Sequence, residues 1–299
     1  MKSEYQRDMS PWPALARYGR MLMLPAARLN VFLFDSDAEN QRGLPLLLLV
    51  HGLADEADTW RHLIDTLAQR YRVMALDLPG FGRSAKPRRS YSLTFYIEII
   101  REILDATAAP AVTLAGHSLG GIICHAFTLM YTQRVKQLAL IDGCLSPLAQ
   151  RFNAGMLRMM LPYIGEHYYN SLRRDPQAAY DTLRGYYADL DGMPAEDRRF
   201  LFQRVNERVW NDGQRDAYFS VLRAMPLWML RRGARLIQAA GQLNMPTSIL
   251  WGADDVILPL ATAHALLRLQ PAARLTVIPK AGHLPHQERP DDVLRAFDF

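Results

Sequence analysis

The chain alternates between short apolar runs and longer segments whose apolar residues recur every three or four positions. The runs predict strands that are buried on both faces, and the longer segments predict amphipathic helices. This alternation is typical of an α/β fold with a mostly parallel sheet between helices, and it predicts up to eight strands. One or two antiparallel strands at the sheet edge are expected within 21–35, and the others at 46–50, 71–77, 111–117, 135–141, 247–252 and 273–278.

Helices are predicted between these strands. Ser92 has the side chain of an N-cap residue and precedes an apolar stripe formed by Ile97, Ile100, Ile103 and Leu104. This pattern predicts a helix that packs one face against the sheet. The remaining helices of the alternating part are expected at 59–71, 119–131, 260–269 and from Pro290.

The alternation stops between residues 146 and 240 and resumes at Thr247. We therefore predict one α/β core formed by 1–145 and 241–299, with 146–240 inserted as an all-helical cap between strands six and seven. Its longest helix is expected to begin at Pro194 and to bury Leu201, Val205 and Val209, with Arg199, Arg204 and Arg208 on its other faces. Prolines are expected to divide the insertion into short helices at positions 162, 176, 194 and 226.

Composition excludes several classes of protein. With 299 residues, 49% of them hydrophobic and 22% charged, the chain is neither disordered nor collagen-like. Two cysteines provide no disulfide framework, and no His/Cys spacing predicts a metal site or another cofactor. The longest apolar run, 44–50, is much shorter than the about 20 residues of a membrane-spanning helix. Without a recognisable signal peptide, the expected location is the cytoplasm.

The net charge of +5 comes from basic residues that are scattered along the chain in pairs such as Arg88–Arg89 and Arg231–Arg232. Such pairs are typical of solvated helix faces, so no nucleic-acid partner is expected. The predicted partner is a small-molecule substrate, and the oligomeric state is left open.

The most specific motif is Gly116-His117-Ser118-Leu119-Gly120-Gly121 between a predicted strand and a predicted helix. Glycines two positions before and after the serine permit the sharp turn that exposes a nucleophile at the start of a helix. A serine hydroxyl is a weak nucleophile at neutral pH, and it needs a base that is itself oriented by an acid. The motif therefore predicts Ser118 as a catalytic nucleophile.

From about Leu44 onward the chain resembles the α/β-hydrolase superfamily. The resemblance rests on Ser118 in its motif together with His51-Gly52, Asp77-Leu78-Pro79-Gly80-Phe81-Gly82-Arg83-Ser84, Trp251-Gly252-Ala253-Asp254-Asp255 with Pro259, and Gly282-His283. It implies His283 as the base, with His286 as the nearby rival. It also implies Asp255 as the acid, although Asp142 and Asp254 remain alternatives.

The same resemblance implies an oxyanion hole formed by two backbone N–H groups, those of Leu119 and Leu53, with Ala54 as the alternative to Leu53. It assigns His51 and His117 to supporting positions. The loop 77–84 is expected to be structural, because its glycines lack the spacing of a phosphate-binding loop.

A serine at this position implies acyl transfer, since relatives that cleave epoxides or carbon–halogen bonds carry aspartate there. The predicted function is hydrolysis of carboxylic esters with apolar short- to medium-chain acyl groups. Carbon–carbon hydrolysis, acyl transfer to acceptors other than water, perhydrolysis and a non-enzymatic ligand receptor are the alternatives. The preference for apolar acyl groups rests on Met and aromatic residues of the insertion, such as Met156, Met159, Tyr169 and Phe219.

Overall fold

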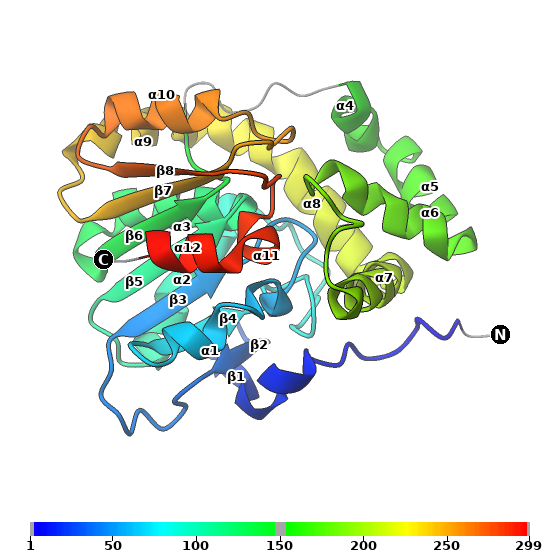
Figure 1. Ribbon diagram of the computed structural model, residues 1–299, viewed down its shortest axis with the longest axis horizontal. Coiled ribbons are helices and arrows are strands. Elements are labelled where there is room, and N and C mark those ends of the chain that lie inside the picture. The colour runs from blue at the N-terminus through cyan, green and yellow to red at the C-terminus, as the bar shows by residue number, and fades with distance from the viewer. Residues whose placement is uncertain (1–2, 147–153, 298–299) are drawn as a thin grey trace.

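Eight strands form one sheet in the order β1-β2-β4-β3-β5-β6-β7-β8 (Figure 1). The computed structural model describes residues 3–146 and 154–297. β1 pairs antiparallel with β2, and β2 pairs antiparallel with β4, whereas the pairs from β4 to β8 are parallel. The strands are β1 Gly19–Leu24, β2 Leu29–Asp35, β3 Leu46–Val50, β4 Arg72–Leu76, β5 Val112–His117, β6 Val135–Ile141, β7 Thr247–Gly252 and β8 Arg274–Ile278. The eight-stranded, mostly parallel sheet predicted from the apolar runs is confirmed.

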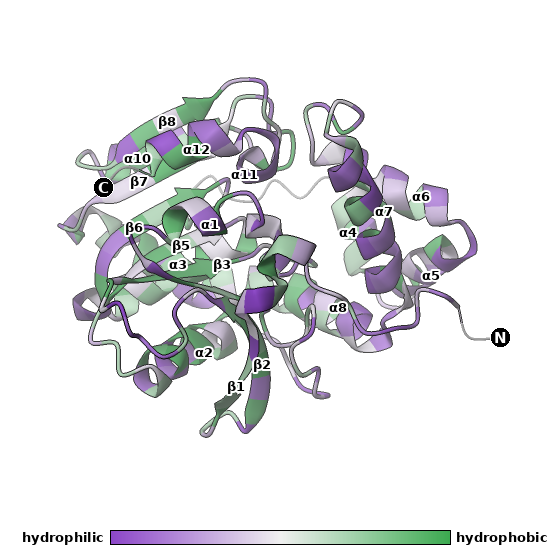
Figure 2. Ribbon diagram, turned by 60° about the horizontal axis from the view of Figure 1, so that its bottom comes forward, coloured by the Kyte–Doolittle hydropathy of each residue, from purple (hydrophilic) through white to green (hydrophobic). Residues whose placement is uncertain are grey.

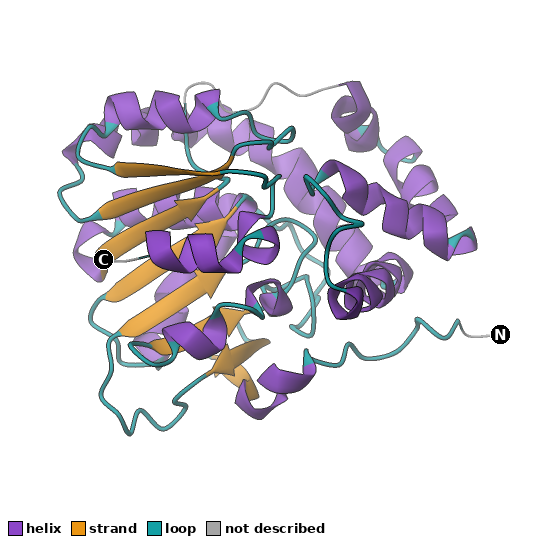
Figure 3. Ribbon diagram, viewed as in Figure 1, coloured by secondary structure: helices purple, strands orange, loops and turns teal. Residues whose placement is uncertain are grey.

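Helices cover both faces of this sheet (Figure 3). Ser92 caps the predicted helix over 93–106, because its hydroxyl accepts a hydrogen bond from the Phe95 N–H at 3.2 Å. The helices are α1 Ile64–Leu67, α2 Leu93–Ala106, α3 Leu119–Met130, α4 Ala154–Met160, α5 Ile164–Ser171, α6 Pro176–Asp181, α7 Ala195–Trp210, α8 Asp212–Trp228, α9 Ala234–Ala239, α10 Ala261–Leu269, α11 Pro285–Glu288 and α12 Pro290–Ala296.

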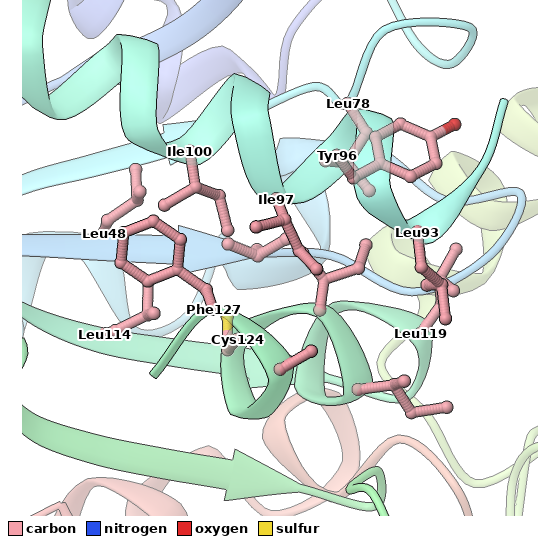
Figure 4. Close-up of a cluster of buried hydrophobic side chains, with 14 of the residues drawn as sticks. Leu48, Leu78, Leu93, Tyr96, Ile97, Ile100, Leu114, Leu119, Cys124 and Phe127 are labelled. Atoms are coloured by element: carbon pink, nitrogen blue, oxygen red, sulfur yellow. The ribbon is translucent and has the colours of Figure 1, made fainter. Parts of the chain in front are cut away.

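The two faces of the sheet have separate apolar cores. On one face, α2 and α3 pack against β3 and β5, where Ile97, Ile100 and Phe127 lie over Leu48 and Leu114 (Figure 4). On the other face, the segment around α1 and helix α12 covers the sheet with side chains that include Trp60, Ile64, Val293 and Phe297. Burial on both faces explains why these strands have unbroken apolar runs rather than alternating patterns.

The segment from α4 to α9 lies between β6 and β7 in the chain and, in its described part, consists of helices and the loops between them. Helices α4 to α7 lie beyond the carboxyl ends of the central strands, and α8 leads back toward the sheet (Figure 1). The strands are mainly hydrophobic and α7 is mainly hydrophilic (Figure 2). No helix among the described residues is long and apolar enough to cross a membrane.

Three local predictions are wrong. Residues 59–71 do not form one helix but a 3-10 turn at Ala57–Trp60 followed by the single turn of α1. The helix expected to begin at Pro194 begins one residue later, at Ala195, and Pro194 is its N-cap in an extended conformation. Pro226 lies inside α8 instead of ending it, and a π-helical turn follows at Met229–Gly233. Pro226 has no N–H to donate to the carbonyl four residues earlier, and the irregular π-helical turn follows within three residues of it.

Candidate active site

Ser118 lies in the turn between β5 and α3, at the carboxyl end of a central strand. Its backbone has φ 52° and ψ −117°, a conformation that residues other than glycine rarely adopt. A Cβ at Gly116 would lie 2.3 Å from the Gly120 carbonyl oxygen, and one at Gly120 would lie 2.2 Å from the Val50 carbonyl oxygen. Both glycines of the motif are therefore required by close backbone contacts around Ser118.

His283 follows β8 and lies directly beside Ser118. Its Nε2 is 2.9 Å from the Ser118 hydroxyl oxygen, and its Nδ1 is 2.8 Å from Oδ2 of Asp255. When Nδ1–H donates to the carboxylate, Nε2 is left to accept the proton of the serine hydroxyl. The fold therefore brings together the side chains of Ser118, Asp255 and His283, which are far apart in the sequence.

Asp255 is held in place from its own loop. Its Oδ1 accepts the N–H groups of Ile257 at 2.8 Å and of Leu258 at 3.0 Å, which leaves Oδ2 for His283. Burial acts to raise the pKa of Asp255, but the hydrogen bond and charge of His283 and the Leu258 N–H together hold that pKa below its usual value. Asp255 is therefore set up to remain a carboxylate.

The two alternative acids lie in different environments. Asp254 is exposed to solvent. Asp142 is fully buried at the end of β6, and its carboxyl oxygen lies within 4.8 Å of the nearest ligand-type atoms of Asp255 and His283. Two unit charges at this separation repel by about 3 kcal/mol at an effective dielectric constant of about 20. Burial and the charge of Asp255 raise the pKa of Asp142 well above its usual value.

The other histidines near Ser118 hold the surrounding loops. His51 accepts the Leu78 N–H through Nε2 at 2.8 Å, and its Nδ1 is 2.7 Å from the Gly52 carbonyl oxygen. His117 donates from Nε2 to the His283 carbonyl oxygen at 2.6 Å, and burial together with the charge of His283 lowers its pKa to about 3. His286, the rival to His283, is 2.8 Å from the Thr59 hydroxyl through Nε2 rather than close to Ser118.

The predicted oxyanion loop approaches Ser118 closely. A Cβ at Gly52 would lie 2.9 Å from Nδ1 of His117 and 3.2 Å from the Ser118 Cβ, so a larger residue at this position would force the His117 side chain to shift. Leu119 is the first residue of α3, where backbone N–H groups have no partner in a preceding turn. Ala54 has a φ of 61°, a left-handed conformation that turns the chain immediately after Leu53.

Sequence reasoning missed the ion pairs that hold this loop. Arg208 of α7 lies 2.8 Å from Glu56, and Arg204 of the same helix lies 3.1 Å from Glu56. Arg208 also pairs with Asp55, whose pKa is lowered because the charge of Arg208 outweighs the effect of burial. Both arginines were expected on faces outside the apolar stripe. The prediction gave no signal that their partners lie about 150 residues away in the sequence.

A second missed contact joins the inserted segment to the His283 loop. The His283 N–H donates to the Tyr186 carbonyl oxygen at 2.7 Å, and the Tyr186 ring centroid is 6.0 Å from that of His283. One carboxylate oxygen of Glu288 accepts the N–H groups of Ala188 and Asp189, and the other accepts that of Gly282. The segment 186–189 is thereby fixed to the loop that carries His283.

Apolar and aromatic side chains of the insertion pack against residues that follow Gly52 and His283 in the sequence. Leu53 and Leu284 pack in one cluster with side chains of the inserted helices. The inserted residues in this cluster include Met156, Met159, Met160, Tyr169, Tyr218 and Phe219.

Among the described residues, the group with metal-like spacing is Asp142, Asp255 and His283. Both imidazole nitrogens of His283 already face Ser118 and Asp255, so a metal ion at this position would displace the hydrogen bond between His283 and Asp255. The arrangement fits proton transfer better than metal ligation.

This chain is similar in sequence and in structure to several known proteins. The model of the alpha/beta hydrolase fold family matches residues 45–290. An uncharacterised protein of Mycobacterium tuberculosis is 29% identical over 82% of this chain and 72% of its own length. The 2-hydroxy-6-oxo-6-(2'-aminophenyl)hexa-2,4-dienoic acid hydrolase of Metapseudomonas resinovorans is 26% identical over 86% of this chain and 84% of its own. A crystal structure of a bacterial membrane phospholipase A superposes with a TM-score of 0.70 at 25% identity, covering 93% of this chain and 84% of the other.

Proposed function

Because the chain belongs to the alpha/beta hydrolase fold family, we propose that it is a serine hydrolase that cleaves carboxylic esters with apolar short- to medium-chain acyl groups. The observation that carries this proposal is the unbroken series of hydrogen bonds from Ser118 through His283 to Asp255. A hydroxyl, an imidazole and a carboxylate in this order are the groups that acyl transfer through a serine requires.

In the proposed mechanism, Ser118 Oγ attacks the ester carbonyl carbon while its proton moves to Nε2 of His283. Asp255 holds the Nδ1–H tautomer and stabilises the imidazolium that forms. The imidazolium then protonates the leaving alkoxide, which departs and leaves an acyl group on Ser118. Water then attacks the acyl-enzyme while His283 takes its proton, and the imidazolium returns this proton to Ser118 Oγ as the bond to the acyl group breaks and the acid leaves.

The negative oxygen of each tetrahedral intermediate would be stabilised by the N–H groups of Leu119 and Leu53. One such donor contributes about 2.7–4 kcal/mol to the transition state. The close approach of Gly52 to Ser118 and the fixed position of the following residues support this assignment.

We assign the inserted helices, within 146–240, the role of a cap that forms the acyl-binding space. Leu53 and Leu284 of the core and the methionine and aromatic side chains of the insertion form one apolar cluster, which supports an apolar acyl group. The similarity to a phospholipase A also supports an ester substrate.

Carbon–carbon hydrolysis is the second candidate, and the similarity to the hexadienoic acid hydrolase of Metapseudomonas resinovorans favours it. Leu53-Ala54 after His51-Gly52 and Leu284 after His283 depart from the sequence expected for carbon–carbon hydrolases, so we place it second. Acyl transfer to another acceptor and perhydrolysis would use the same three residues. A ligand receptor of this fold would not need a reactive serine.

Hydrolysis of nitrophenyl esters from acetate to dodecanoate by the purified protein tests this proposal. The expected result is turnover that rises with acyl length and then declines, and that falls by about 10⁴- to 10⁶-fold in Ser118→Ala. Turnover of acetate alone would contradict the apolar acyl site. Full activity of Ser118→Ala would contradict the nucleophile.

A panel of aryl-substituted oxohexadienoates, assayed in parallel, distinguishes carbon–carbon hydrolysis from ester hydrolysis. If the protein turns over these compounds but hydrolyses no ester, carbon–carbon hydrolysis becomes the supported function and ester hydrolysis is contradicted. Failure of wild-type Ser118 to react with a fluorophosphonate would favour the receptor and overturn both enzymatic candidates.

A further inference from the structure

Asp142 is a buried carboxyl group that the proposed mechanism does not use. It follows β6 with a φ of 44°, and its side chain is fully buried. Oδ1 accepts the Gly252 N–H at 2.9 Å. Oδ2 is also buried but receives no N–H or O–H donor from the described residues. An ionised carboxylate would leave this oxygen uncompensated, whereas a protonated one would have a hydrogen to donate.

Asp255 is the acceptor that faces this group. A carboxylate has about four acceptor positions, and three at Asp255 are taken by the N–H groups of Ile257 and Leu258 and by Nδ1 of His283. A carboxyl oxygen of Asp142 and one of Asp255 lie within 4.8 Å of each other, and both side chains are buried. The charge of Asp255 is thus compensated by three donors, whereas Asp142 has one.

We propose that Asp142 holds a proton at neutral pH and donates it to the Asp255 carboxylate, so that it acts as a positioning residue for the Ser118–His283–Asp255 series. The proton stays on Asp142 throughout turnover, and no bond to substrate forms. The raised pKa of Asp142, caused by burial and by the charge of Asp255, supports this assignment.

A fourth donor has two consequences for Asp255. It fixes the orientation of the carboxylate that selects the Nδ1–H tautomer of His283. It also withdraws negative charge from the oxygens that face the imidazole, so His283 gives up its proton more readily to the leaving group. The charged and titratable groups that act on Asp142 are Asp255, with His283 behind it, and Glu288 of α11.

The variants Asp142→Asn and Asp142→Ala test this proposal. The kinetic measurements on them rest on the proposed function, because they require a reactive Ser118. Asparagine has the shape of a protonated aspartate, and its amide donates to Asp255 while its carbonyl accepts the Gly252 N–H. Alanine provides no donor. The readouts are the pH profile of kcat/KM for an ester and the pH profile of the rate at which a fluorophosphonate labels Ser118.

In Asp142→Asn, the acidic limb of both profiles is expected at the wild-type pH, with a rate within about threefold of wild type. In Asp142→Ala, the rate is expected to fall by about 10- to 100-fold, because a hydrogen bond to a charged group is lost. Its acidic limb is expected at higher pH, because the less compensated charge of Asp255 holds the proton on His283 more strongly.

Two results would overturn the proposal. An acidic limb at lower pH in Asp142→Asn would mean that the native Asp142 is ionised, since the substitution would then remove a negative charge. Equal loss in both variants without any movement of the limb would mean a purely structural role. Asp35→Asn is the matched control. Asp35 is a buried acid at the end of β2, and its carboxylate lies 2.8 Å from Arg72. This variant is expected to lose stability without moving the limb.

An infrared difference spectrum between wild type and Asp142→Asn at neutral pH decides the protonation state directly. The expected spectrum contains the C=O stretch of a protonated carboxylic acid, which the Asp35→Asn difference spectrum lacks. Its absence would refute the proposal, even if Asp142→Ala fails to fold. A wild-type protein that reacts with neither ester nor fluorophosphonate would instead refute the proposed function, and the spectrum would still report on the proton.

Discussion

At the scale of single residues, two adjacent acids illustrate how the site is specified. Asp254 is exposed, whereas Asp255 is buried and accepts hydrogen bonds from His283 and from two backbone N–H groups. The two residues lie in and just after a turn at 253–254 that follows β7, and this turn exposes one side chain and buries the other. The family resemblance implied Asp255, and the contact with His283 supports that proposal, but the resemblance did not suggest the protonated state that we propose for Asp142.

Replacing Asp255 by asparagine is expected to lower kcat by about 10⁴-fold, because the amide would favour the wrong tautomer of His283. The matched variant Asp254→Asn changes an exposed side chain and is expected to alter the free energy of unfolding by less than about 0.5 kcal/mol. Steady-state kinetics of the two variants provide the measurement. Comparable loss of kcat in both would remove Asp255 from its proposed role.

At the scale of elements, α7 connects the insertion to the loop after β3. Arg204 and Arg208 project from this helix toward Glu56, and Arg61 of the core pairs with Asp197 near the first turn of α7 at 2.6 Å. The Glu56 side chain is almost fully buried, so its charge depends on both arginines for compensation. Because the same loop carries Leu53, α7 holds the proposed oxyanion hole in place.

Arg208→Met is expected to destabilise the protein by about 3 kcal/mol, because it leaves Asp55 and Glu56 without their shared partner. It is also expected to lower kcat for ester hydrolysis, since the loop before Glu56 loses its anchor. Arg199→Met is the control, because Arg199 is an exposed arginine of the same helix. Denaturant unfolding and kinetics of both variants test the prediction, which fails if the two behave alike.

The contact of Asp197 in α7 with Arg61 and His62 of the core is expected to depend on pH. Burial acts to raise its pKa, but the hydrogen bond of His62 and the charge of Arg61 hold that pKa below the usual value. A depressed pKa adds stability above the ordinary aspartate range near 3.9, and this stability is lost as the pH falls through the lower folded value.

Hydrogen exchange of α7 amides is therefore expected to accelerate relative to β5 as the pH is lowered into that range, after correction for the intrinsic pH dependence of exchange. In Asp197→Asn, this additional acceleration is expected to be absent, because the titrating group has been removed. An unchanged acid response of the variant would show that other groups control the attachment.

At the scale of the whole molecule, the sequence predicted what local patterns encode. The run Leu46–Val50 identified a buried strand because a strand covered on both faces needs apolar residues throughout, and the glycines around Ser118 identified the turn because their neighbours leave no room for a Cβ. The helix expected at 59–71 was wrong. There Thr59 bonds to His286, a contact that lies 227 residues away in the sequence and favours the 3-10 turn over a longer helix.

The contacts that join the insertion to the core could not be predicted for the same reason. Polar residues on a helix usually face solvent, and nothing local distinguishes the buried Arg204 from the exposed Arg199. Likewise, the sequence placed Asp142 among the possible acids, but its buried contact with Asp255 depends on the pairing of β6 with β7.

The most direct test of the account is to trap the acyl-enzyme. Wild-type protein is mixed with a nitrophenyl ester, quenched in acid during the first turnover, digested and analysed by mass spectrometry. The account predicts one acyl adduct on the peptide that contains Ser118, appearing together with a burst of nitrophenol and absent from Ser118→Ala. Steady ester turnover with no adduct, or an adduct on another residue, would contradict it.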